Sequence, residues 1–145
     1  PRLIVLRSLG KFFGLAGARV GFILAAPDLL ARMSETMGPW AVSGPARAVA
    51  RLALQDSAWQ ETTRARLQTA GERLHALLAP LGEVKSTALF ATLSTPHANE
   101  LHEALARQGI LTRRFEQQPL LRFGLPGAPG EWQRLTGALA GWSKK

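Results

Sequence analysis

The sequence predicts an α/β protein. Short apolar runs typical of buried strands, such as residues 3–6 and 120–123, alternate with longer segments whose apolar residues recur at helical spacing, such as residues 56–78. Glycine and proline residues separate these segments. The chain has 145 residues, of which 46% are hydrophobic, so it can bury one ordinary core. Length alone therefore predicts a single domain.

The first half of the chain is expected to form two strands and then helices. Residues 3–6 and 20–25 are apolar throughout, which is typical of buried strands, the second of them antiparallel or at an edge. Proline followed by aspartate at 27–28 predicts a helix start, and Gly38-Pro39 ends that helix near Met37. Helical spacing also covers 43–54 and then 56–78, where Pro80 and Gly82 end it.

The second half predicts a compact α/β unit. Strands are expected at 89–93, 110–115 and 120–124, where apolar residues run together or alternate with polar ones. Helices are expected at 97–108, with Gly109 at the end, and at 131–142. Pro126 and Pro129, with nearby glycines, mark the last turn.

The charge of the chain is basic but scattered. Eighteen Lys and Arg residues against ten Asp and Glu give a net charge of +8, and 14 of the 18 are arginine. No cluster of basic residues or patch with interleaved aromatics indicates a nucleic-acid site, so solvated helix faces are favoured. The absence of cysteine excludes disulfides. No apolar stretch approaches the roughly 18 residues of a membrane-spanning helix.

Residues 7–22 carry the strongest signal for chemistry. The apolar run 3–6 ends at Ser8, Gly10 and Lys11, and further glycines and Arg19 follow. A serine hydroxyl, backbone amides near Gly10 and an arginine fork are groups that bind a phosphate dianion. A lysine amine held beside an anchored phosphate is suited to form an imine with an aldehyde cofactor.

This segment resembles the cofactor-lysine motif of fold-type-I enzymes that use pyridoxal phosphate, S-x-x-K followed by G-L-A-G-x-R-x-G. The matching positions are Ser8, Lys11, Gly14 to Gly17, Arg19 and Gly21. Within this class I and II aminotransferase superfamily, the chain is most similar to the decarboxylases of L-threonine O-3-phosphate in cobalamin biosynthesis, which are close relatives of the histidinol-phosphate aminotransferases. That closer resemblance rests on residues 38–43, 109–115 and 120–126.

The resemblance implies a domain organisation. Fold-type-I enzymes have a large cofactor domain before the lysine, and only ten residues precede Lys11, so we expect the C-terminal part of a longer enzyme. Residues 1–26 would end the large domain, 27–80 would form bridging helices, and 81–145 would form the small C-terminal α/β domain. The family also implies a homodimeric, cytoplasmic enzyme whose residues for the pyridine nitrogen and ring lie upstream. The 145 residues alone are therefore expected to be inactive.

The resemblance assigns roles to five residues. Lys11 would bind the cofactor covalently, and Ser8 and Arg19 would bind its phosphate. Arg122, which lies among apolar residues and needs an anionic partner if it points inward, would hold the substrate carboxylate. Arg113 matches a second substrate-side arginine, which would bind the substrate phosphate. Because Arg113 and Arg114 alternate along a strand, only one can face the site, and Arg113 is favoured.

The implied function is decarboxylation of a phosphorylated amino acid by a pyridoxal-phosphate enzyme. Transamination of a phosphorylated amino acid or amino alcohol remains a close alternative, because both reactions use nearly the same residues. A non-catalytic basic binding module is an alternative of another class. Neither a metal site, a nucleotide P-loop nor a nucleophile elbow is predicted, because the required spacings are missing.

Overall fold

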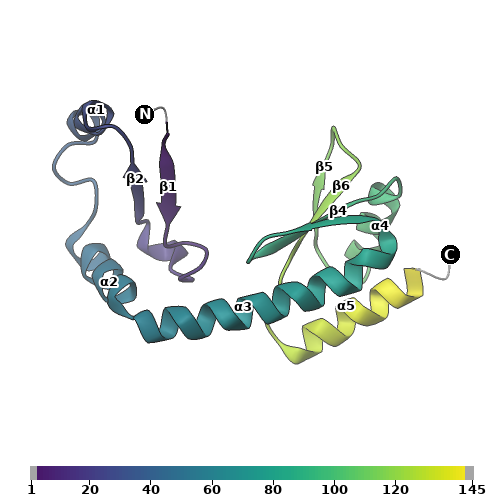
Figure 1. Cartoon of the computed structure of the whole chain (residues 1–145). Helices are drawn as coiled ribbons and strands as arrows, with labels where there is room; N and C mark the ends of the chain where they lie inside the picture. The colour runs from purple at the N-terminus through teal and green to yellow at the C-terminus, as the bar shows by residue number, and fades with distance from the viewer. Residues whose placement is uncertain (1–2, 143–145) are drawn as a thin grey trace. The chain divides into compact units, whose positions relative to one another are not determined.

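The computed structural model of the chain describes residues 3–142 (Figure 1). The chain forms two compact units, residues 1–60 and 61–145, and the boundary lies inside the longest helix. Strands and helices occur in both units, so the predicted α/β class is confirmed. The three-part division at residues 26 and 80 concerns a longer enzyme and stays a prediction.

The first unit contains a two-stranded sheet and two complete helices. Strand β1 (Val5–Ser8) pairs antiparallel with β2 (Gly21–Leu24), and the short 3-10 helix η1 (Ala16–Ala18) lies in the loop between them. Helices α1 (Pro27–Met37) and α2 (Gly44–Gln55) follow, as the sequence predicted. The Ser43 hydroxyl accepts a hydrogen bond from the Ala46 amide at 3.4 Å, which explains where α2 begins.

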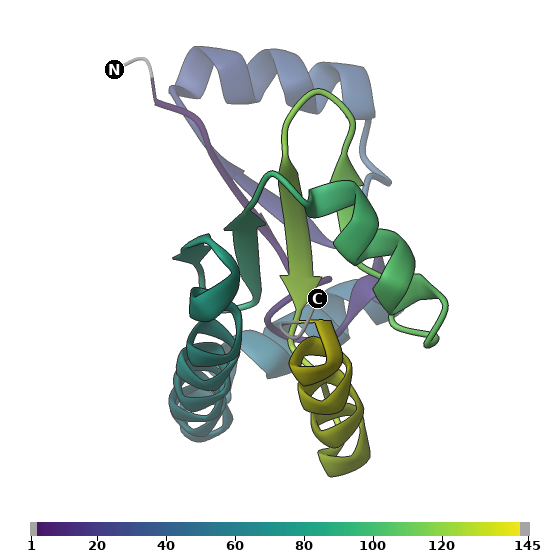
Figure 2. The same cartoon turned by 90° about the vertical axis from the view of Figure 1, so that its right-hand side faces the viewer.

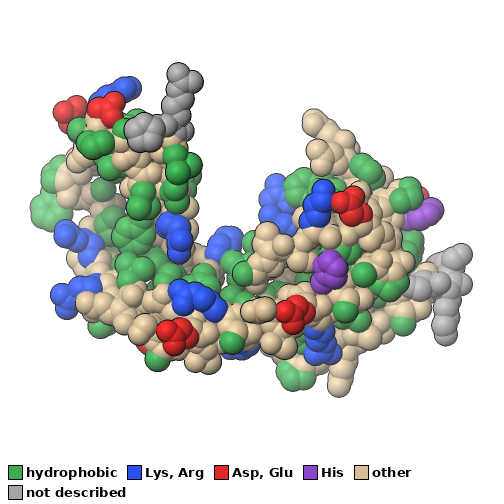
Figure 3. Space-filling model, viewed as in Figure 1, with side chains coloured by type: hydrophobic (Ala, Val, Ile, Leu, Met, Phe, Trp, Pro, Cys, Tyr) green, Lys and Arg blue, Asp and Glu red, His purple; other side chains and the backbone are tan. Residues whose placement is uncertain are grey.

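The prediction that the apolar run 3–6 is buried is wrong for this structure. The exposed fractions of Leu3 and Leu6 are 69% and 72%, and Phe22 and Leu24 of the paired strand are also exposed. A two-stranded ribbon buries its side chains only when another layer packs on it. Among the described residues of the first unit, the buried apolar cluster is small, with Leu9, Val20 and Ala50 at its centre. Hydrophobic side chains are accordingly visible at the surface of this unit (Figure 3).

The second unit is a four-stranded antiparallel sheet with helices on one face. Helix α3 (Ser57–Leu78), which begins in the first unit, leads through the 3-10 turn η2 (Ala79–Leu81) to β3 (Glu83–Ser86) and β4 (Phe90–Ser94). Helix α4 (Ala98–Ala106), strands β5 (Arg113–Phe115) and β6 (Leu120–Gly124), and helix α5 (Pro129–Trp142) complete it. The strand order is β3-β4-β6-β5.

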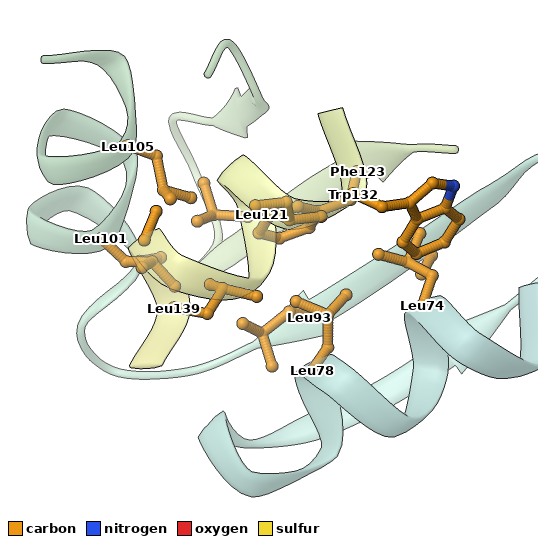
Figure 4. Packing of buried hydrophobic residues seen from close by; sticks show 13 residues of the cluster. Leu74, Leu78, Leu93, Leu101, Leu105, Leu121, Phe123, Trp132 and Leu139 are labelled. Atoms are coloured by element: carbon orange, nitrogen blue, oxygen red, sulfur yellow. The ribbon is translucent and has the colours of Figure 1, made fainter. Parts of the chain in front are cut away.

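The core of the second unit lies between this sheet and its helices (Figures 2 and 4). Alternate strand residues point into it: Leu93 lies beside Leu78 of α3 and Leu139 of α5. Leu121 lies on the side of Leu101 and Leu105 of α4, and Leu74 of α3 belongs to the same cluster. The remaining members are Ala91, Ala98, Phe123, Trp132, Leu135 and Ala138. Since side chains alternate between faces, the residues between them lie on the other face of the sheet, here called the open face.

Gly82 provides a test of how β3 is positioned. Its φ is +154°, and a Cβ atom at this position would collide with the backbone oxygen of Ser94 on β4. We expect Gly82→Ala to lower the free energy of unfolding by about 1–3 kcal/mol, because the backbone of the β3–β4 pair must shift. Denaturant unfolding of the chain measures this. Gly137→Ala, in helix α5 where a Cβ meets nothing within 4 Å, should instead be neutral or stabilising by up to about 1 kcal/mol.

Glu131 stabilises the start of α5 in a pH-dependent way. Its Oε2 accepts hydrogen bonds from the backbone N–H of Gly127 at 2.7 Å and of Ala128 at 3.1 Å. The Ala128 amide first, and then that of Gly127, holds the pKa of Glu131 below its usual 4.5. A lowered pKa in the folded state stabilises the fold above pH 4.5, and this contribution is lost as the pH falls through the folded-state pKa.

Wild type is therefore expected to unfold at a higher temperature than Glu131→Gln at pH 7, and this difference should fade below pH 4.5. Thermal unfolding followed by circular dichroism from pH 7 to pH 3 measures it. Glu116→Gln makes the same change of net charge in a loop and serves as the reference. A difference that persisted unchanged at pH 3 would mean that the charge of Glu131 is not its source.

None of the helices within residues 3–142 combines the length and apolarity needed to span a bilayer.

Candidate functional site

The loop between β1 and β2, residues 8–20, carries the three predicted cofactor residues and is here called the Lys11 loop. Its ends are held together, since Ser8 is paired with Gly21 and the Leu9 amide donates to the Val20 carbonyl at 3.2 Å. Leu9 is only 1% exposed and accepts a hydrogen bond from the Leu15 amide at 2.9 Å. The loop is therefore anchored from inside by one buried leucine.

Ser8 is the last residue of β1 and the first residue of the Lys11 loop. Its Oγ accepts a hydrogen bond from the Gly10 amide at 3.0 Å. This amide is thus used within the loop, which differs from the expectation that the amides near Gly10 face an anion. The Ser8 hydroxyl still has its own O–H to donate to a phosphate oxygen.

Lys11 is an exposed residue of the loop and occupies the first position of a tight turn. The Gly14 amide donates to the Lys11 carbonyl at 3.0 Å, and Gly14 has a φ of +68°. The two residues inside the turn are Phe12 and Phe13, whose rings pack on Trp59 with centroids 5.5 and 5.7 Å away. These aromatic contacts fix the turn, and with it the backbone of Lys11, while the lysine side chain is in solvent.

Arg19 closes the 3-10 helix of the loop in a conformation that is uncommon for arginine. Its φ of 52° and ψ of 40° are left-handed, and its backbone N–H and one guanidinium nitrogen, Nη1, both donate to the Ala16 carbonyl, at 3.4 and 3.2 Å. A left-handed non-glycine residue persists only where its surroundings hold it there. The remaining N–H groups of the guanidinium can donate to an anion.

The chemistry of the Lys11 loop fits a phosphate-bearing aldehyde. The loop contributes a hydroxyl, a primary amine and a guanidinium, and the sequence has no acidic residue before Asp28. Hydroxyl and guanidinium donors suit a phosphate dianion, and the amine is the group that condenses with an aldehyde. The residues present therefore fit pyridoxal phosphate, and the roles of Ser8, Lys11 and Arg19 stay predictions.

The two predicted substrate arginines are neighbours on the open face of the second unit. Arg113 of β5 is the register partner of Arg122 of β6, and partners in an antiparallel pair project to the same face. Continuing across the sheet, Arg122 pairs with Thr92, which pairs with Lys85. One row across four strands thus carries three cations and one hydroxyl, and is here called the cationic row.

Arg114 points to the opposite face. Its register partner is the buried Leu121, and its Nη1 donates to Asn99 Oδ1 of α4 at 3.3 Å. Strand alternation thus separates the two adjacent arginines, with Arg113 beside Arg122 and Arg114 engaged by α4. The assignment of Arg113 to a substrate phosphate stays a prediction.

Aromatic residues that were not predicted from the sequence flank the cationic row. The Arg122 guanidinium carbon, Cζ, lies 4.4 Å from the centroid of the Phe90 ring, and that of Arg113 lies 5.4 Å from Phe115. The alternation of side chains along a strand could have placed Phe90 on the open face. However, β4 pairs with β6 and not with β5, which follows β4 in the sequence, and this pairing cannot be read from the sequence. Within residues 3–142, no group of three His, Cys, Asp or Glu side chains is placed to hold a metal ion.

Comparisons of the sequence with a family model and with individual proteins point to the same family. Residues 1–139 match the family model for class I and II aminotransferases. The chain is 51% identical to a threonine-phosphate decarboxylase of Pseudomonas aeruginosa, covering 99% of the chain and 44% of that protein. It is 33% identical to a histidinol-phosphate aminotransferase of Symbiobacterium thermophilum, covering 96% of the chain and 40% of that protein.

The fold has close neighbours among solved structures. One is a histidinol-phosphate aminotransferase of Sinorhizobium meliloti in complex with pyridoxal-5'-phosphate, with a TM-score of 0.79 and 22% identity. The match covers 96% of this chain and 40% of that one. The chain therefore spans less than half the length of the relatives it matches.

Proposed function

Since this chain belongs to the family of class I and II aminotransferases, we propose that it is part of a pyridoxal-phosphate-dependent decarboxylase that acts on L-threonine O-3-phosphate. The observation that carries the proposal is the 51% identity, over 99% of the chain, to a protein named threonine-phosphate decarboxylase. The donor set of the Lys11 loop supports it, because the loop has the groups that this cofactor requires.

In this proposal the Lys11 loop holds the cofactor. Lys11 binds it covalently through the side-chain nitrogen Nζ, and Ser8 and Arg19 donate hydrogen bonds to its phosphate. The buried Leu9 and the packing of Phe12 and Phe13 on Trp59 hold the backbone of the loop in place. When bound, pyridoxal phosphate supplies a conjugated ring that accepts the electron pair left on the substrate carbon.

The cationic row would bind the substrate. L-threonine O-3-phosphate has two anionic groups, and Arg122 and Arg113 present two guanidinium groups on neighbouring strands. We assign the carboxylate to Arg122, whose planar fork matches it, and the phosphate to Arg113. By holding the carboxylate, Arg122 sets which bond to Cα is broken.

The net reaction releases CO₂ and puts a proton on Cα, so L-threonine O-3-phosphate becomes 1-amino-2-propanol O-2-phosphate. We place this step in cobalamin biosynthesis, in a cytoplasmic homodimer. The small phosphorylated amino acid is the partner that the site would take, whereas nucleic acid and membrane are not. These assignments belong to the proposal for the whole enzyme.

The second candidate is transamination, which the 33% identity to a histidinol-phosphate aminotransferase favours. The full-length protein, supplied with pyridoxal phosphate, separates the two. Decarboxylation predicts release of ¹³CO₂ from carboxyl-labelled L-threonine O-3-phosphate in the absence of any keto acid. Transamination predicts no CO₂, but formation of glutamate from 2-oxoglutarate with histidinol phosphate as the amino donor.

A basic binding module, the candidate of another class, predicts neither product. It predicts binding to a polyanion such as heparin that weakens steeply with salt. Absence of both products, together with such binding, would overturn the enzymatic proposal.

A further inference from the structure

The aromatic ring beneath Arg122 is an unassigned feature of the open face. Phe90 begins β4, two residues before Thr92, which is the register partner of Arg122. Phe90 is therefore the diagonal neighbour of Arg122 on the same face, and such neighbours are within reach for aromatic and long side chains. The guanidinium carbon lies over the ring at 4.4 Å from its centroid, which is within the distance of a cation–π pair.

The residue opposite Phe90 makes room for this stacking. The register partner of Phe90 is Gly124, and a Cβ atom built at Gly124 would meet nothing within 4 Å. The residue directly opposite Phe90 on β6 therefore has no side chain that could cover the ring. The guanidinium of Arg122, two residues away along β6, covers the ring instead. Phe90 and Arg122 are both half-buried although they lie on the open face.

The charges around Arg122 favour this contact. Its register partner on β5 is Arg113, so two like charges lie side by side, which is unfavourable. Among the described residues of the second unit, Arg122 has no ion pair to offset this repulsion. The electron-rich face of Phe90 is the attractive partner that the structure gives the Arg122 guanidinium.

We propose that Phe90 is a positioning residue for Arg122: its ring holds the guanidinium flat on the open face, so that the edge of the guanidinium can meet a carboxylate. A stacked guanidinium has one face covered and its N–H fork directed outward, which is the arrangement for bidentate binding. The role of Phe90 in catalysis rests on the proposed function of Arg122. The contact between Phe90 and Arg122 does not depend on that function, so the contact and the catalytic role can be tested separately.

The first measurement concerns the chain alone. Phenylglyoxal modifies accessible arginines, and peptide mass spectrometry compares the rate at Arg122 with that at the exposed Arg107. We expect Phe90→Leu to increase the relative rate at Arg122 about threefold, and Phe90→Tyr, which keeps the ring, to leave it as in wild type. Phe115→Leu removes the ring beside Arg113 and is the matched control, which should leave the rate at Arg122 unchanged.

The second measurement uses the full-length enzyme. Phe90→Leu is expected to raise KM for L-threonine O-3-phosphate about two- to thirtyfold with kcat within about twofold, the range that a cation–π contact provides. Phe90→Tyr should restore KM. In an Arg122→Ala background, Phe90→Leu should change KM less than twofold, because the residue through which Phe90 acts is gone.

The outcomes distinguish the two hypotheses. If Phe90→Leu changes the reactivity of Arg122 but the full-length protein releases no CO₂, the positioning role stands and the proposed function fails. If the enzyme is active and Phe90→Leu changes neither reactivity nor KM, the positioning role is overturned. Circular dichroism checks that Phe90→Leu is folded, and Phe90→Met, which also lacks a ring, replaces it if it is not.

Discussion

Replacing Lys11 with alanine in the full-length protein is expected to abolish covalent binding of pyridoxal phosphate and to lower the decarboxylation rate by about 10³-fold or more. The physical reason is that no other primary amine lies in the Lys11 loop, whose remaining donors are a hydroxyl and a guanidinium. Those groups bind phosphate but do not condense with an aldehyde. Borohydride treatment followed by peptide mass spectrometry measures the covalent product, and ¹³CO₂ release measures the rate.

Lys85 is the matched control, since it is the other lysine within residues 3–142 and lies on the exposed edge strand β3. The Lys85→Ala protein should carry the borohydride-trapped label on Lys11, as wild type does. A label found on Lys85 in wild type, or full labelling of Lys11→Ala, would contradict the assignment of the cofactor lysine. The 145-residue chain, measured in parallel, shows whether the Lys11 loop is sufficient to bind the cofactor.

Arg122→Ala is expected to raise KM for L-threonine O-3-phosphate and to lower kcat/KM by about 10²- to 10³-fold. A bidentate bond between a guanidinium and a carboxylate contributes about 3–4 kcal/mol in a partly desolvated site, which corresponds to that factor. Arg122→Lys should recover little of this loss, because an ammonium group lacks the planar fork. Steady-state kinetics on the full-length protein measure both variants.

Arg107→Ala is the control for loss of one arginine. Arg107 lies just after α4 and forms an exposed ion pair with Glu103 at 3.1 Å, a type of contact that contributes little. Its kcat/KM should stay within about twofold of wild type. An Arg122→Ala enzyme with unchanged kcat/KM would remove Arg122 from the substrate site and would direct attention to Arg113.

Most of the helices could be predicted from the sequence because their signals are local. Pro27 and Asp28 determine the start of α1, Ser43 caps α2, and Gly38 ends α1 with a positive φ of 68°. Strand β6 was also predicted at its observed bounds, since an apolar run is bounded by turn residues. Strand β3 was missed because only one of its four residues, Val84, is apolar.

Burial could not be predicted in the same way. The run 3–6 is as apolar as a central strand, yet it is exposed here, since burial depends on whether a second layer packs on the ribbon. Strand β5 is shorter than the predicted 110–115, because only residues 113–115 find partners on β6. The residues that pair with a strand or pack on it are distant in the sequence. Neither the exposure of residues 3–6 nor the length of β5 is therefore encoded in the local sequence.

The sequence by itself determined the family and the donor groups of the Lys11 loop, because the spacing of Ser8, Lys11 and Arg19 lies within 12 residues and depends on local backbone turns. Only the tertiary structure decided which arginines lie on the open face of the sheet and which aromatic ring lies beside Arg122. Arg113, Arg122 and Phe90 come from three strands that are brought together by antiparallel register. The physical reason is that hydrogen bonds between distant strands set that register, and the open-face contacts follow from it.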